Sequence, residues 1–117
     1  YDRDILVRVI VKKTAAHYSY KSVRISKTDF PVLTCAAALT QEGVQAAVGA
    51  CPAKAALVKD AEQLATLPMT GEKAQAFAEY AAGLLPTETN PRGSAAYRTQ
   101  LIKVLTARCL TELGGKA

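Results

Sequence analysis

The side chains that most often carry out catalysis are sparse in this sequence. There is one histidine, His17, and no serine and aspartate stand at a spacing that would complete a catalytic triad with it. The three cysteines, Cys35, Cys51 and Cys109, form no Cys-x-x-Cys pair and have no histidine close by, which argues against a zinc site or a disulfide framework. We therefore predict no catalytic residue and no metal ligand in this chain.

The cysteines and glycines have ordinary structural explanations. Cys35 and Cys51 stand among small apolar residues and are expected in the core, whereas Cys109, directly after Arg108, has only a weak case for a reactive thiol. The glycines are scattered and form no phosphate-binding loop, and the glycine pair at 114–115 is expected to end a helix. These residue types suggest a domain that supports chemistry carried out elsewhere.

Positive charge is the second feature that could indicate a function. Lys and Arg total 15 against 10 Asp and Glu, for a formal net charge of +5. Basic residues within 12–27 interleave with Tyr18 and Tyr20, a combination that nucleic-acid-binding sheets use. The glycine-aromatic signature of an RNA-recognition strand is missing, which argues against a nucleic-acid partner. A noncatalytic basic interaction module remains the alternative function.

The first half of the chain has the two-residue periodicity of β-strands. Residues 4–11 alternate β-branched side chains and predict a strand that pairs antiparallel with a second one over residues 17–25. Residues 32–39 and 44–48 predict two further strands, joined by a tight turn at Gly43. Residues 32–39 are rich in alanine, so a helix is the alternative for that run.

The second half has the periodicity of helices. Residues 61–67 follow Asp60 as a candidate N-cap and predict a short helix that ends at Pro68. Thr70 and Ser94 are the expected N-caps of two longer amphipathic helices. Their apolar stripes are Ala74, Phe77, Ala78, Ala81, Leu84 and Leu85 in the first, and Tyr97, Leu101, Val104, Leu105 and Leu110 in the second.

Strands followed by helices predict a single α+β domain over residues 1–117. We expect a mostly antiparallel sheet of about four strands in the N-terminal half, packed with about three helices from the C-terminal half. No apolar run approaches the roughly 18 to 20 residues that a membrane-spanning helix needs. The unpaired cysteines and the lack of a signal-peptide pattern lead us to expect a cytoplasmic protein.

The last predicted helix carries a motif that its packing alone does not require. A capped amphipathic helix explains the spaced apolar residues but not a Tyr97-Arg98 pair so soon after the cap. This region resembles the end of the FAD-binding subunit of the molybdenum hydroxylases, which include xanthine dehydrogenase and carbon monoxide dehydrogenase. The matching residues are Ser94, Ala95, Tyr97, Arg98, Leu101, Val104, Leu105, Arg108 and Leu110.

A second region resembles the same family in the correct order. Residues 20–24, followed by Asp29 and the apolar run 32–39, are similar to the family's aromatic-lysine segment, basic turn and buried strand. Residues 48–55 also resemble the family's continuation. The match covers essentially the whole chain, as the C-terminal domain of a longer flavoprotein subunit.

The resemblance implies a division of labour for an FAD-dependent oxidoreductase. An upstream domain would hold most of the FAD, and this domain would cover the flavin and dock to iron-sulfur and molybdopterin subunits. Electrons would pass from those partners to FAD and on to an acceptor such as NAD or a quinone. The isolated domain is not expected to catalyse a reaction.

The resemblance also implies roles for individual residues. Lys21 matches the lysine that approaches the pyrimidine side of the flavin, where a cation would stabilise negative charge on the reduced ring. Tyr20 could pack beside the ring, and Arg24, Lys27 and Asp29 would belong to a loop near it. Their alternatives are a solvated strand lysine and a plain surface turn. A third expectation is that Arg98 anchors the last helix to the sheet through carboxylate or carbonyl contacts.

Overall fold

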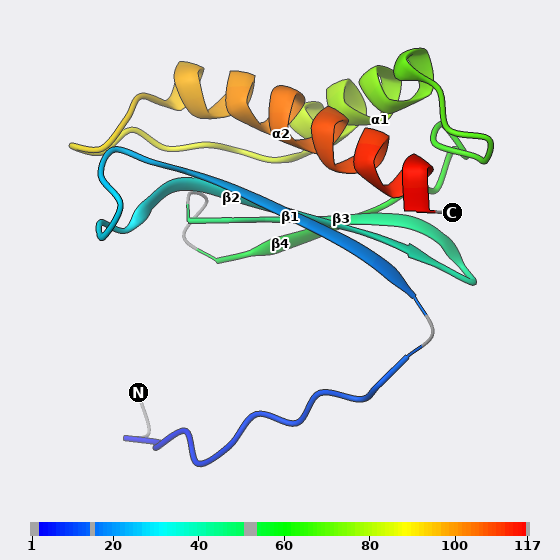
Figure 1. Cartoon of the computed structure of the whole chain (residues 1–117). Helices are drawn as coiled ribbons and strands as arrows, with labels where there is room; N and C mark the ends of the chain where they lie inside the picture. The colour runs from blue at the N-terminus through cyan, green and yellow to red at the C-terminus, as the bar shows by residue number, and fades with distance from the viewer. Residues whose placement is uncertain (1–2, 15, 51–53, 117) are drawn as a thin grey trace.

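A sheet and a pair of helices form the two layers of this protein (Figure 1). The computed structural model describes residues 3–14, 16–50 and 54–116. The sheet has four antiparallel strands in the order β1-β2-β3-β4, and both helices cover the same face of it. The elements are β1 (His17–Arg24), β2 (Pro31–Thr40), β3 (Gly43–Gly49), β4 (Ala56–Lys59), α1 (Gly71–Leu84) and α2 (Ala95–Lys116).

Alternation along the strands separates a buried face from an open face. On β2 and β3, Cys35 pairs with Val48 and Ala37 with Ala46, and these four side chains are buried beneath the helices. Successive side chains in a strand point to opposite faces, so the residues between them form the open face. The predicted strands over 17–25, 32–39 and 44–48 are confirmed, and the helix alternative for 32–39 is wrong.

The turn between β2 and β3 lies where the sequence predicts it. The predicted turn at Gly43 joins β2 to β3, and its φ of 116° is a backbone conformation that glycine adopts without strain.

Strand β4 was not expected from the sequence. It is only four residues long, and Leu57 and Lys59 are exposed, so its hydrophobic pattern is too short to be distinctive.

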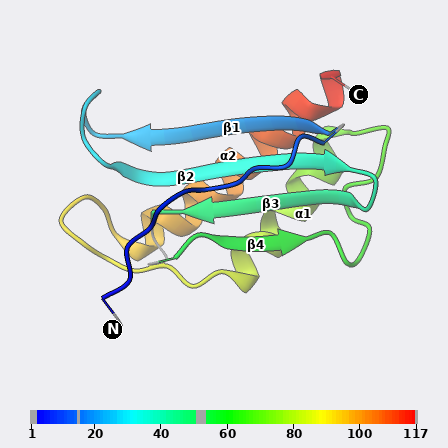
Figure 2. The same ribbon diagram turned by 90° about the horizontal axis from the view of Figure 1, so that it is seen from below.

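The prediction of a strand at residues 4–11 is wrong. None of residues 3–14 belongs to a strand, and β1 pairs with β2 instead. Six apolar side chains between positions 5 and 11 are 74–86% exposed, and the segment runs past the open face of the sheet (Figure 2). Alternation shows which side chains could be buried together, but a strand also needs a neighbour for its backbone hydrogen bonds. No described strand provides that neighbour.

The short helix predicted at residues 61–67 is also wrong. Both Asp60 carboxylate oxygens accept backbone hydrogen bonds at 2.8 Å, from Leu64 and Ala65, four and five residues ahead. A helix N-cap would instead bind the second or third residue of the helix. Gln63 has a φ of 55°, which is incompatible with a right-handed helix. The carboxylate therefore closes a loop, and the described residues contain two helices rather than about three.

Helix α1 follows the prediction closely at its start. Thr70 is its N-cap, and the Thr70 hydroxyl accepts a hydrogen bond from the Lys73 amide. The predicted stripe is buried except for Leu84, which is 56% exposed, whereas Ala82 is buried. Leu84 is the last residue of the helix, and the buried Leu85 follows it as the C-cap.

Helix α2 starts as predicted but does not end at the glycine pair. The Ser94 hydroxyl accepts a hydrogen bond from the Tyr97 amide, as an N-cap does. The helix continues through both glycines to Lys116. A Cβ atom on Gly114 would lie 2.7 Å from the Cβ of Met69, so this glycine permits close packing against the segment before α1.

The apolar stripe of α2 is only partly as predicted. Leu101, Leu105 and Leu110 are buried, Val104 is half-buried and Tyr97 is exposed. Within the described residues, neither helix is long and apolar enough to cross a membrane.

The pairing of β1 with β2 contains an irregularity that leaves one residue unpaired. Val23 lies opposite Leu33, but the next residue, Arg24, lies opposite Pro31. Val32 is therefore skipped in the register, as in a β-bulge. Val32 and Leu33 are both buried although they are adjacent in the strand. The carbonyl group of Val32 needs a partner from outside the ladder.

Arg98 of α2 supplies that partner. Its side chain is 1% exposed, and its Nε donates to the Val32 carbonyl at 2.9 Å. Nη1 donates to the carbonyls of Glu88 and Gly93, and Nη2 donates to Oδ1 of Asn90 at 2.7 Å. One guanidinium thus joins the sheet, the loop before α2 and the helix itself. The prediction that Arg98 anchors the last helix to the sheet is confirmed.

Arg98→Met should destabilise the protein by about 3 kcal/mol or more, because it leaves buried carbonyl oxygens without donors. Urea denaturation followed by circular dichroism measures this free energy of unfolding. Arg108→Met is the matched control, because Arg108 is an exposed arginine on the same helix and its loss should cost under about 0.5 kcal/mol. Equal costs for the two variants would contradict the anchoring role.

Candidate functional site

Lys21 lies on the edge strand β1, on the face that α2 covers. Its Nζ donates a 2.8 Å hydrogen bond to Oε2 of Glu112, and the two charged groups form an ion pair. The Lys21 side chain is 34% exposed and that of Glu112 is 43% exposed. Both groups therefore combine a fixed partner with access to solvent.

A shallow concavity surrounds this ion pair. We call it the Lys21 hollow; it has a volume of about 460 Å³ and is lined by Lys21, Ala107, Arg108, Thr111 and Glu112. Four of these residues come from one side of α2, so the helix and the edge strand together form the walls.

The charges in the Lys21 hollow favour a ligand with an electron-rich edge. The hydrogen bond to Glu112 raises the pKa of Lys21 above its ordinary value of 10.5, so the ammonium stays protonated at neutral pH. Arg108 is a second cation in the lining, which has only one carboxylate, that of Glu112. Ala107 gives the wall an apolar part. An ammonium at such an edge can donate a hydrogen bond to a carbonyl or anionic group of a flat ligand.

The structure does not bring Tyr20 together with Lys21. Tyr20 points to the open face, where it lies opposite Ala36 of β2 and is 58% exposed. The two side chains are neighbours in sequence but project from opposite faces of the strand. Because β1 is the edge strand, both faces are accessible at its free side.

The loop between β1 and β2 is held by a cluster that we call the Asp29 clamp, consisting of Arg24, Asp29, Phe30 and Arg92. Arg92 donates through Nη2 to Oδ1 of Asp29 at 3.0 Å, and its guanidinium lies 5.3 Å from the centre of the Phe30 ring. Arg24 donates to the backbone carbonyl of Asp29 at 2.8 Å. The clamp ties the β1–β2 loop to the loop before α2, while Lys27 is exposed.

Two of these partners were missed by sequence reasoning. Neither Arg92 nor Glu112 was singled out in the sequence. Arg92 is 63 residues from Asp29, and Glu112 is 91 residues from Lys21. No local pattern joins residues so far apart. The only local signal at Glu112 is its position four residues after Arg108. Such a spacing of opposite charges is common on helix surfaces.

The two described cysteines, Cys35 and Cys109, lie in the core. Cys35 and Cys109 are fully buried, which confirms the core position predicted for Cys35 and removes the weak case for Cys109 as an accessible thiol. Cys109 Sγ contacts the Cys35 carbonyl at 3.8 Å, and Cys35 Sγ lies 3.4 Å from Oγ1 of Thr106. The neighbouring Cys109 thiol and burial raise the pKa of Cys35. Cys51 lies outside the described residues.

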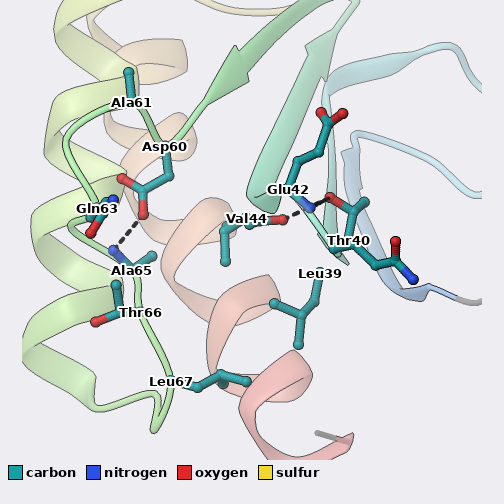
Figure 3. A pocket seen from close by; sticks show the side chains of 12 residues that line it. Leu39, Thr40, Glu42, Val44, Asp60, Ala61, Gln63, Ala65, Thr66 and Leu67 are labelled. Carbon is teal, nitrogen blue, oxygen red and sulfur yellow. Dashed lines mark hydrogen bonds between the residues drawn. The ribbon is translucent and has the colours of Figure 1, made fainter.

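A second hollow, of about 370 Å³, lies between the β2–β3 turn and the loop after β4 (Figure 3). Two of its polar side chains, Asp60 and Thr40, are engaged in local structure. The Asp60 carboxylate holds the loop amides, and the Thr40 hydroxyl donates to the Gly43 carbonyl and accepts from the Glu42 amide. We therefore assign this hollow a structural role. Among the described residues, no three His, Cys, Asp or Glu side chains are grouped to hold a metal ion.

Comparisons with known proteins match this chain to one family. The sequence model of a family described as the CO dehydrogenase flavoprotein C-terminal domain matches residues 18–113. No curated protein matches the chain.

Solved structures share the fold at low sequence identity. A carbon monoxide dehydrogenase from Hydrogenophaga pseudoflava, which lacks the Mo-pyranopterin moiety of the molybdenum cofactor, matches with a TM-score of 0.76 and 20% identity over 90% of this chain and 39% of its own. Quinoline 2-oxidoreductase from Pseudomonas putida 86 matches with a TM-score of 0.72 and 23% identity over 89% of this chain and 39% of its own.

A third structure, the cyanide-inactivated form of a Cu,Mo-CO dehydrogenase, matches with a TM-score of 0.69 and 22% identity over 92% of this chain and 40% of its own. The α+β fold expected from the sequence resemblance is thus confirmed. This chain spans about two fifths of the length of these solved chains.

The Asp29 clamp predicts a pH-dependent stability. The hydrogen bond from Arg92, together with the Phe30 amide, lowers the pKa of Asp29 below its ordinary value of 3.8. The ionised carboxylate therefore stabilises the fold above about pH 4, and this contribution is lost as the pH falls through the lowered pKa. Thermal unfolding should show Asp29→Asn with a lower Tm than the parent at pH 7, and the gap should shrink toward pH 2.5. A gap that is constant with pH would contradict the ion pair.

Proposed function

Because this chain belongs to the CO dehydrogenase flavoprotein C-terminal domain family, we propose that it supports the FAD of an electron-transfer subunit in a molybdenum hydroxylase of the xanthine dehydrogenase type. The family match over residues 18–113 is the main support. The length of the solved relatives, about two and a half times the aligned part, supports an upstream domain that holds most of the FAD.

The observation that carries the flavin role is the Lys21 ammonium at the mouth of an open hollow. FAD, when bound, supplies the redox chemistry that accepts electrons and passes them on. Lys21 would donate a hydrogen bond to the carbonyl at the pyrimidine end of the ring and place a positive charge there. That charge favours the more negative, reduced ring, so Lys21 would raise the reduction potential and help to retain the cofactor.

The remaining residues would act around that contact. Tyr20 would pack beside the ring from the other face of the edge strand, which requires the ring to lie at the free side of β1. The Asp29 clamp would hold the neighbouring loop, which carries the exposed Lys27, in a fixed shape. The domain would close over the flavin and dock to iron-sulfur and molybdopterin subunits, which would deliver electrons for an acceptor such as NAD or a quinone.

The alternative of a basic interaction module has less support. Two cations that contribute to the positive charge are engaged inside the domain: Arg92 with Asp29, and the buried Arg98 with carbonyl groups. Such side chains are not free to form the phosphate contacts on which nucleic-acid binding depends.

Lys21→Ala in the intact, FAD-containing subunit should lower the two-electron midpoint potential by about 30 mV, which corresponds to about 1.4 kcal/mol for a hydrogen bond to a charged group. If the lysine also holds the ring, FAD should be lost faster on gel filtration. Spectroelectrochemical titration measures the potential. Lys59→Ala, at an exposed lysine on the opposite sheet face, is the matched control and should leave both readouts unchanged. An unchanged potential and unchanged FAD retention in Lys21→Ala would remove Lys21 from the site.

A further inference from the structure

Glu112 holds the charged group of Lys21 in place from the helix opposite. Its carboxylate lies 2.8 Å from the Lys21 ammonium, and both side chains open onto the Lys21 hollow. The contact joins β1 to the last turns of α2, so the side chain of a strand residue is directed by a helix residue. Without the carboxylate, the four flexible carbon bonds of the lysine side chain would let the ammonium point elsewhere.

The same contact determines how much positive charge a ligand in the hollow would experience. An ammonium 2.8 Å from a carboxylate forms a nearly neutral pair when viewed from a distance, while a group in contact with the ammonium still experiences mainly its positive end. The ion pair is partly exposed, so solvent weakens but does not cancel this effect. Arg108 lines the same hollow and keeps its overall charge positive.

We infer that Glu112 is a positioning residue that orients the Lys21 ammonium toward the flavin and moderates its charge, and so keeps the flavin potential lower than Lys21 alone would set it. This inference rests on the proposed flavin role of Lys21. Under this inference, Lys21 raises the flavin reduction potential and Glu112 lowers it. A purely structural role for the ion pair would not change that potential.

Glu112→Gln in the intact, FAD-containing subunit tests the inference. Glutamine keeps an oxygen that can accept the Lys21 hydrogen bond but removes the negative charge. The reduced flavin should then bind up to about tenfold more tightly relative to the oxidised flavin, which for two electrons is a rise of about 30 mV in the midpoint potential. In the Lys21→Ala background the rise should be smaller, because only the direct effect of the removed negative charge on the flavin remains.

Two further variants keep the test independent of folding. Glu112→Asp retains the charge on a shorter side chain and should move the potential less than Glu112→Gln. Glu79→Gln removes an exposed carboxylate from α1 and should leave the potential unchanged. Thermal unfolding of each variant shows whether the fold is intact.

The possible results separate this inference from the proposed function. A rise in Glu112→Gln that becomes smaller without Lys21 supports both. If Lys21→Ala lowers the potential but Glu112→Gln does not raise it, the inference about Glu112 is wrong while the flavin role of Lys21 stands. If neither variant changes the potential, the proposed function of Lys21 fails. A rise of the same size or larger in the Lys21→Ala background would overturn the inference, because Glu112 would then not act through Lys21.

Discussion

The buried guanidinium of Arg98 is the interaction on which the rest of the arrangement depends. It satisfies the Val32 carbonyl at the point where the β1–β2 register skips a residue, and it also binds two carbonyls of the loop before α2. Removing a charged group from water is costly, and only this set of hydrogen bonds offsets the cost. Because the contacts fix the start of α2 against β2, they also set where the far end of the helix passes β1. The position of Glu112 relative to Lys21 follows from that anchoring.

In the proposed function, the candidate site supports the chemistry of a bound flavin. Its contribution is a cation held at the edge of a sheet, with a carboxylate beside it and an apolar wall behind it. In the proposed function, this arrangement would bias the charge that a bound ring prefers to carry. The rigidity of the support matters more than the number of functional groups, since the effect of a charge depends on its distance from the ring.

Much of the fold could be predicted from the sequence, because local periodicity reports burial. The strand that became β3 places Val44, Ala46 and Val48 at alternate positions, and Thr70 and Ser94 are ordinary N-caps. The failures have physical causes. Residues 4–11 alternate as a strand does but have no described strand to pair with, and Asp60 binds amides that close a loop instead of starting a helix. Lys21 was predicted through a family resemblance, whereas its partner Glu112, 91 residues away, required the structure.

The central claim is that Lys21 meets the pyrimidine end of a flavin from the edge of this domain. The most direct measurement is an experimental structure of the intact subunit with FAD bound. We expect Nζ of Lys21 to lie within hydrogen-bond distance, about 2.7–3.2 Å, of a carbonyl oxygen at that end of the ring. Glu112 should lie on the other side of the ammonium. A flavin bound elsewhere, with the Lys21 hollow facing solvent or a different subunit, would contradict it.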